Sequence, residues 1–97
     1  MKITSKFFLN LSKGTENNRP IYLRLILDRE NTKRAIGHSI NPKHWNEQKE
    51  DCKIILINNT IIKLKQKIND IQFELQKEPR NLVVKDLADL VFEKSSL

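Results

Sequence analysis

The chain has 97 residues, which suits one small domain and leaves little room for a second. A chain of this length buries roughly 60–65% of its unfolded surface, so its core is too small for a self-contained enzyme with a deep pocket. The single cysteine, Cys52, excludes an intramolecular disulfide and a cysteine-based zinc site and favours a reducing compartment. The sequence contains no apolar run of the ~20 residues that a membrane span needs, and its start does not have the pattern of a signal peptide. We therefore expect a cytoplasmic protein without a membrane partner.

The net charge of +6 is concentrated in the first half of the chain. Residues 1–45 carry nine basic and three acidic side chains, whereas residues 46–97 carry nine of each. This asymmetry indicates a polyanion-binding surface on one part of the fold and a balanced, solvated surface on the other. The alternative is that the positive charge serves solubility alone.

The first 40 residues alternate between apolar and polar side chains as β-strands do. We expect strands over residues 3–11, 20–28 and 32–40, with a polar loop at 12–19 and a turn at 29–31. The short connections predict a three-stranded antiparallel sheet. The apolar face of the second strand consists of Ile21, Leu23, Leu25 and Leu27.

After Pro42 the pattern becomes helical. The 3, 4, 3, 4 spacing of one apolar stripe predicts a long helix that begins at Asn58 and ends at Glu78, with Asn58 or Asn59 as its N-cap. The residues of the stripe are Ile61, Leu64, Ile68, Ile71 and Leu75. A second, shorter helix is expected over residues 84–93. The stripe could instead form a coiled-coil seam, but two heptads are too few, and packing in a core is the favoured use.

Together these elements predict an α+β fold, in which the three-stranded sheet packs on the long helix because neither can bury its apolar side alone. Residues 1–97 would form a single domain with a sheet part at 1–45, a connector at 46–57 and a helical part at 58–97. Trp45 would close one end of the interface between the sheet and the helix. The opposite face of the sheet would remain uncovered.

The uncovered face would carry basic, amide, hydroxyl and aromatic side chains. Its expected members are Lys6, Phe8, Asn10, Tyr22, Arg24, Ile26, Lys33 and Ser39. Arginine can bind guanine through two hydrogen bonds, asparagine can pair with adenine, and lysine, tyrosine and serine can hold phosphates. A narrow sheet also fits a major groove about 12 Å wide. The alternative is an ordinary solvated face of a half-buried sheet.

Two segments resemble a known family. They are Arg-Pro-Ile-Tyr-Leu-Arg-Leu at 19–25 and Lys-Arg-Ala-Ile-Gly-His-Ser-Ile-Asn-Pro-Lys-His-Trp-Asn at 33–46, followed by a helix that opens near Ile57. Together they resemble the N-terminal arm-type DNA-binding domain of tyrosine recombinases, the integrases of phages and of conjugative or mobilisable transposons, especially those of Bacteroides-like bacteria. The resemblance extends from about residue 3 to residue 92. The sequence departs from the family at the turn over 28–31, where relatives often have Asn-Gly, and at Val84, where relatives often have a threonine cap.

The resemblance implies that the sheet lies in the major groove of arm-type sites that flank the recombination core. In full-length relatives a core-binding domain and a catalytic domain follow, so this chain is expected to be a fragment that cannot cut or join DNA. The expected partner is double-stranded DNA, with other integrase protomers as a further partner in the full-length protein. The expected DNA-binding residues are Lys6, Asn10, Lys13, Arg19, Tyr22, Arg24, Lys33, Arg34, Ser39 and Lys43.

The sequence predicts no catalytic set, metal site or cofactor. His38 and His44 have no cysteine nearby, and His38 is expected at the edge of the core. Two other functions stay open. One is an RNA or single-strand binder that stacks bases on Tyr22 and Phe8. The other is a protein-interaction module that uses the helical half.

Overall fold

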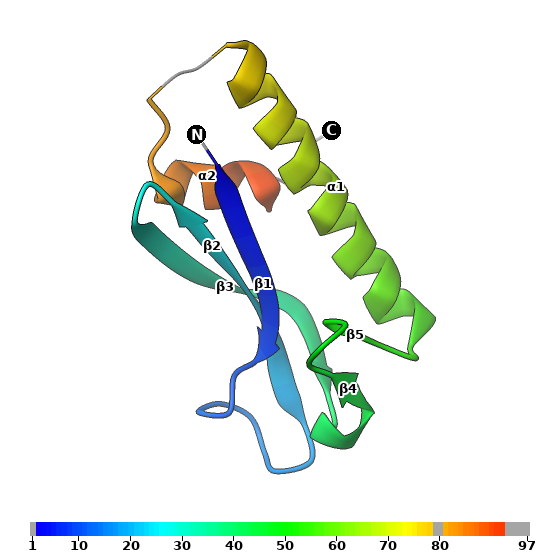
Figure 1. Ribbon diagram of the computed structural model, residues 1–97. Helices are drawn as coiled ribbons and strands as arrows, with labels where there is room; N and C mark the ends of the chain where they lie inside the picture. The colour runs from blue at the N-terminus through cyan, green and yellow to red at the C-terminus, as the bar shows by residue number, and fades with distance from the viewer. Residues whose placement is uncertain (1, 79–80, 93–97) are drawn as a thin grey trace, which may run out of the picture.

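The computed structural model describes residues 2–78 and 81–92. Strands β1 (Ile3–Leu9), β2 (Arg19–Leu27) and β3 (Glu30–Ile40) form an antiparallel sheet in that order, with β2 in the centre. A 3₁₀ turn, η1 (Pro42–His44), leads into a two-stranded hairpin of β4 (Trp45–Asn46) and β5 (Asp51–Cys52). Two helices follow, α1 (Ile55–Lys77) and α2 (Val84–Val91) (Figure 1). The predicted α+β class, with three antiparallel strands, one long helix and one short helix, is confirmed.

The strict alternation of β2 places the core on one side of the sheet. Ile21, Leu23 and Leu25 are fully buried and Leu27 is nearly so, whereas the residues between them are only half-buried. The edge strands add Phe7 from β1 and two isoleucines from β3 to the same apolar cluster. Because successive side chains of a strand point to opposite faces, this arrangement leaves the other face of β2 for polar and aromatic groups.

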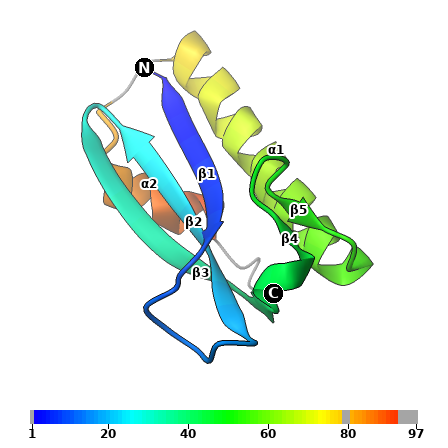
Figure 2. The same cartoon turned by 60° about the horizontal axis from the view of Figure 1, so that its bottom comes forward.

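Both helices pack on the apolar side of the sheet, each against different strands. Helix α2 lies against β2 and β3, while α1 runs alongside β1 and also packs against β5 and α2 (Figure 2). The short helix, whose position the sequence left open, therefore covers the centre of the sheet together with part of β3. The short helix can approach the strands closely because its buried side includes Ala88, which has no exposed surface and little bulk. The predicted stripe of α1 is nevertheless buried, except that Ile71 is only partly covered.

The turn between β2 and β3 is shorter than expected. The strands continue to Leu27 and resume at Glu30, so only Asp28 and Arg29 form the turn. Both residues have positive φ angles, of 50° and 72°. Positive φ at both central residues is the geometry of a two-residue hairpin turn, whose twist matches the twist of the strands that it joins. At the other end of the sheet, β1 stops at Leu9, and Leu11 is exposed rather than part of the strand.

The long helix begins earlier than predicted and does not use an asparagine cap. It starts at Ile55, and its N-cap residue, Ile54, makes no side-chain capping bond. The side chain of Asn58 instead pairs with the backbone of Cys52: its Oδ1 accepts from the Cys52 N–H at 3.1 Å, and its Nδ2 donates to the Cys52 carbonyl. An amide side chain suits this role because it has both a donor and an acceptor. The Asn58 side chain thereby fastens β5 to the first turn of α1.

The segment expected to be a plain connector, residues 46–57, contains most of the β4–β5 hairpin as well as the start of α1. Trp45, the first residue of that hairpin, is buried in the core cluster, as the sequence predicted. The second helix ends at Val91, and the predicted end at residue 93 lies outside the described residues. In the described part of the chain, neither helix has the length and apolar character to cross a membrane.

Truncation of the central strand should reveal how much the fold depends on it. Leu23 has no exposed surface, so Leu23→Ala should lower the free energy of unfolding by about 2–5 kcal/mol through lost burial and a residual cavity. Ile62→Ala, on the exposed side of α1, is the matched control and should change it by less than about 0.5 kcal/mol. Urea denaturation followed by circular dichroism measures both. Equal stability of the two variants would contradict the assigned core face.

Candidate nucleic-acid interface

The register of the sheet arranges the side chains of its uncovered face in rows that run across the strands. Lys6 of β1 lies opposite Arg24 of β2, and Arg24 lies opposite Lys33 of β3. Three cationic side chains therefore occupy one row, which we call the cationic row. Like charges directly opposite each other in a sheet are destabilising, so this row is unfavourable in the free protein and favours an anionic partner.

A second row lies beside the first and consists of uncharged groups. Phe8 of β1 is opposite Tyr22 of β2, and Tyr22 is opposite Ala35 of β3. The two rings are tilted against each other, with their centroids 6.0 Å apart. We call these three residues the apolar row. On the other side of the cationic row, a third row consists of Thr4, Ile26 and Asn31.

The side chain of Arg24 connects the cationic row with the apolar row. Its guanidinium carbon lies 5.3 Å from the centroid of the Phe8 ring, within the range of a cation–π contact. The Nε atom of Arg24 is buried and has no hydrogen-bond partner. Arg24 forms no ion pair with any residue that the structure describes. An aromatic ring thus orients this guanidinium, and no carboxylate of residues 2–78 and 81–92 neutralises it.

The loop between β1 and β2 brings further polar groups to one end of the open face. The Nη1 atom of Arg19 donates to the Lys13 carbonyl at 2.9 Å, and the Lys13 ammonium lies 6.0 Å from the centre of the Tyr22 ring. Asn10 follows the end of β1, where its side chain accepts from the Ser12 N–H. Lys13 therefore lies next to the apolar row, and Asn10 lies just beyond β1 in the same loop. Arg19 shares the strand face of the buried Ile21 and pairs in register with the buried Ile40, so only its contact with Lys13 links it to this end of the open face.

Gly14 allows this loop to form. Its φ of 76° lies in the left-handed region, and a Cβ at this position would come within 2.3 Å of the Asn18 carbonyl oxygen. A side chain therefore has no room at this position, and the conformation of the loop depends on glycine.

The far end of β3 is less regular. The register shifts between the Tyr22–Ala35 pair and the Pro20–Ser39 pair. Ser39 is exposed, but this irregular stretch separates it from the cationic row. Lys43 is exposed in η1, beyond the end of the strand. Neither residue forms part of the three rows.

Arg34 lies apart from the other predicted DNA-binding residues. It pairs in register with the buried Leu23, and its guanidinium lies 2.7 Å from a carboxylate oxygen of Asp89 in α2. The alternation of β3 thus turns Lys33 toward the open face and Arg34 toward the helices. His38 also faces this side, where it is half-buried and hydrogen-bonds with Thr60 of α1 at 2.9 Å, consistent with the predicted place at the edge of the core.

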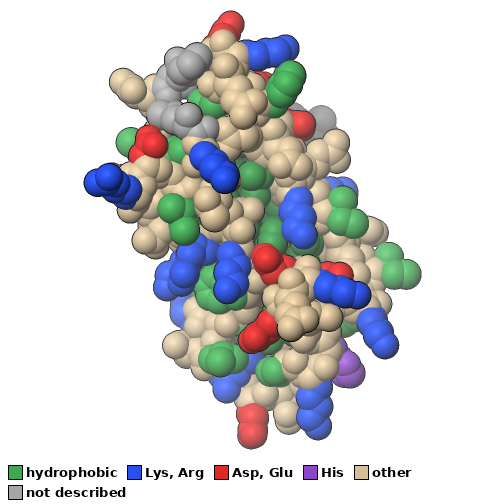
Figure 3. Space-filling model, in the orientation of Figure 1, with side chains coloured by type: hydrophobic (Ala, Val, Ile, Leu, Met, Phe, Trp, Pro, Cys, Tyr) green, Lys and Arg blue, Asp and Glu red, His purple; other side chains and the backbone are tan. Residues whose placement is uncertain are grey.

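Two members of the apolar row are not among the predicted DNA-binding residues. The sequence predicts Phe8 on the open face but not among the DNA-binding residues, and it gives no sign that Ala35 belongs to the site. Only the cross-strand register, which is a tertiary property, shows that both belong to one row with Tyr22. The space-filling view shows lysine and arginine side chains gathered around apolar ones over the strands (Figure 3).

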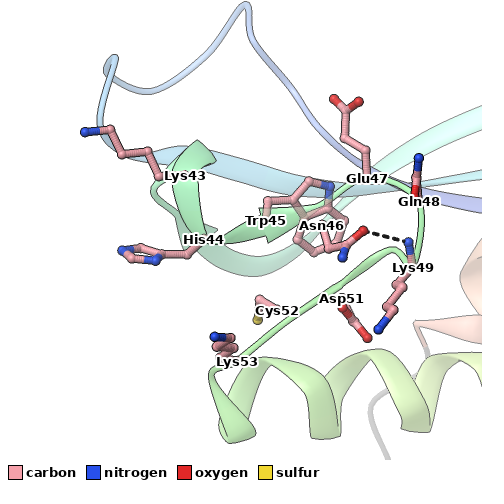
Figure 4. Close-up of a pocket in the computed structure, with 10 residues that line it drawn as sticks. All are labelled: Lys43, His44, Trp45, Asn46, Glu47, Gln48, Lys49, Asp51, Cys52 and Lys53. Atoms are coloured by element: carbon pink, nitrogen blue, oxygen red, sulfur yellow. Dashed lines mark hydrogen bonds between the residues drawn. The ribbon is translucent and has the colours of Figure 1, made fainter.

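The β4–β5 hairpin lines a hollow whose side chains have mixed charge. Lys43, Lys49 and Lys53 line it together with Glu47 and Asp51, and the Asn46 side chain accepts from the Lys49 N–H (Figure 4). Among the described residues, no three histidine, cysteine or acidic side chains lie together in a way that could hold a metal ion. The hollow therefore lacks the single sign of charge that the sheet face has.

Comparison with known proteins agrees with the geometry of the open face. The family model of the arm DNA-binding domain matches residues 7–88, which is most of the chain. The chain belongs to this family of non-catalytic DNA-binding modules, as the two sequence segments predicted. No curated protein and no solved structure matches the chain.

The opposite orientations of two neighbouring arginine and lysine side chains provide a test of the interface. Lys33→Ala should weaken binding to duplex DNA several-fold, because it removes one cation from the open face. Arg34→Ala removes the same charge from the helix side and should leave the affinity nearly unchanged. Fluorescence anisotropy with a labelled duplex measures both, and circular dichroism checks that each variant is folded. A larger loss for Arg34→Ala would contradict the assignment of the open face.

Proposed function

We propose that this domain binds double-stranded DNA sequence-specifically at arm-type sites, as the N-terminal domain of a tyrosine recombinase encoded by a mobile element. The domain serves DNA integration and site-specific recombination in the cytoplasm. It holds the recombinase on DNA, while catalysis belongs to another part of the parent protein. Other integrase protomers assemble with the full-length protein on the same DNA.

The observation that carries this proposal is the cationic row. Lys6, Arg24 and Lys33 extend across all three strands, and the acidic residues of this half of the chain lie at the two ends of β2, in the loop, in the turn and at the first residue of β3. A surface that concentrates charge of one sign attracts a polyanion and increases the rate of association. The duplex supplies that polyanion as two closely spaced lines of phosphates.

The dimensions of the sheet support binding in the major groove. Neighbouring strands are about 4.8 Å apart, so three strands measure about 10 Å across. This width fits a groove about 12 Å wide. In such a position the edge-strand residues Lys6 and Lys33 face the phosphates of the groove walls, and Arg24 of the central strand faces the base edges.

The two alternative functions have less support. A single-strand binder needs open aromatic platforms, whereas Arg24 lies over the Phe8 ring and Lys13 over the Tyr22 ring. A protein-interaction module would use the exposed side of α1, where Ile55, Ile62 and Phe73 are more than half exposed. Titration with duplex DNA, single-stranded DNA and RNA of the same sequence, and an unrelated acidic protein separates these functions.

Binding should weaken steeply as salt is added. If about six cations of the domain neutralise phosphates, the slope of log K against log salt concentration should be near −5, because each contact contributes about −0.9. Anisotropy titrations of one duplex over a series of salt concentrations give the slope. A slope near zero would overturn the proposed polyanion partner.

Arg24 and Lys6 should affect affinity in different ways. Arg24→Ala should cost about 1–3 kcal/mol on a duplex sequence enriched from a random library and much less on a scrambled duplex, because a guanidinium reads guanine through two hydrogen bonds. Lys6→Ala should weaken both duplexes about equally, as expected for a phosphate contact.

Arg24→Lys serves as the conservative variant, since it keeps the charge but loses the two-pronged geometry. It should therefore retain affinity for the scrambled duplex and lose preference for the enriched one. If Arg24→Ala lowers both affinities in proportion, Arg24 contacts phosphate and not a base.

A further inference from the structure

The rings of the apolar row lie at the central strand, where the proposed interface would meet base edges, because the Phe8 ring leans toward the Tyr22 ring and the Arg24 guanidinium. The composition of this row is unusual for a surface that binds a polyanion. Phe8, Tyr22 and Ala35 form a continuous uncharged band across all three strands. Ala35 is exposed, and the two rings are half-buried. Arg24 and Lys13 lie over the faces of the rings, which prevents base stacking there but leaves the ring edges and the Ala35 methyl group open to a partner. A phenylalanine ring and an alanine methyl group can neither neutralise a phosphate nor form a hydrogen bond with it. The band is therefore suited to contact with an apolar group of the partner.

The major groove offers one prominent apolar group, the 5-methyl of thymine. Proteins recognise it by contact with apolar side chains such as alanine and phenylalanine. Cytosine carries a hydrogen at the same position unless it is methylated, and guanine and adenine have no methyl group in the groove, where they present N7 with O6 or N6. A band of this chemistry in the major groove therefore selects for a methylated pyrimidine.

The neighbouring Arg24 side chain fixes where this contact would fall. The cationic row and the apolar row are two residues apart along each strand, which corresponds to about 6.7 Å. The guanidinium of Arg24 leans over Phe8 and shortens that separation further. A base contacted by Arg24 and a base contacted by the apolar row would thus lie within about two base pairs of each other, given the spacing of about 3.4 Å between successive nucleotides of a strand.

We propose that the apolar row of Phe8, Tyr22 and Ala35 recognises the 5-methyl group of a thymine next to the base pair that Arg24 reads. This inference rests on the proposed binding of the sheet in the major groove. It assigns a specificity-determining role to uncharged side chains that add nothing to the electrostatic attraction. It also implies that 5-methylcytosine, which carries a methyl group at the same ring position, can make this contact in place of thymine.

The test uses a duplex enriched from a random library, in which each thymine is replaced singly by uracil. Uracil lacks the methyl group but keeps the same base pair and the same O4 acceptor. At one or two positions near the guanine that Arg24→Ala identifies, uracil should weaken binding about fourfold, the value for one buried methyl group. In Phe8→Thr and Tyr22→Thr the same replacement should have a smaller effect, because the ring that contacts the methyl group is gone.

Ile26→Thr is the matched control. It removes an apolar side chain from the same face of β2, but from the row on the other side of Arg24. This variant should retain the fourfold effect of uracil, and Tyr22→Phe, which keeps the ring, should retain it as well. Circular dichroism establishes that each variant is folded before its affinity is compared.

The outcomes separate this inference from the proposed function. If the protein binds the duplex and uracil is tolerated at every position, duplex binding stands and recognition by the apolar row is wrong. If Ile26→Thr abolishes the effect of uracil and the Phe8 and Tyr22 variants do not, the contact belongs to the other row, and the inference is again wrong. If the library yields no bound duplex, both the proposed function and the inference fail.

Discussion

The burial of one face of β2 is the constraint on which the rest of the structure depends. Leu23 and Leu25 have no exposed surface, and Arg24 lies between them in the sequence. A shift of β2 by one residue would expose both leucines and bury a guanidinium without a partner, which is strongly unfavourable. The hydrophobic effect therefore fixes the register of the sheet. The same register aligns Lys6, Arg24 and Lys33 on the opposite face.

The helices complete this arrangement by covering one side only. Helix α2 lies on β2 and β3, while α1 runs beside β1. At this edge of the sheet the backbone N–H of Ile3 donates a hydrogen bond of 2.6 Å to the side chain of Gln72 in α1. A second edge donor, the Phe7 N–H, bonds to Glu50 of the β4–β5 hairpin at 2.6 Å. These bonds occupy backbone groups that could otherwise pair with another strand. The apolar core is thus built on one face and closed along one edge, and the cationic face stays open.

Charge and shape act at different ranges in the proposed interface. The cations attract the duplex over a distance of about a Debye length, which is roughly 10 Å at moderate salt. Contacts with base edges act only once the sheet is seated in the groove. Because Arg24 lies against Phe8, the group that contributes to the long-range attraction also borders the row that we assign to short-range recognition. In the proposed interface, specificity and attraction therefore share one small surface, as suits a domain with a modest core.

The sequence by itself determined the class of the fold, the buried face of β2, the stripe of α1 and the family to which the chain belongs. These features follow from local periodicity, which records which side of each element is buried. Only the tertiary structure decided that α2 covers the centre of the sheet, that Asn58 fastens β5 to α1, and that Arg34 turns to Asp89. It also decided which residues of separate strands form a row, as for Phe8 and Ala35. Cross-strand register depends on how distant segments meet, and a side chain's local sequence carries no information about the partner that it will face.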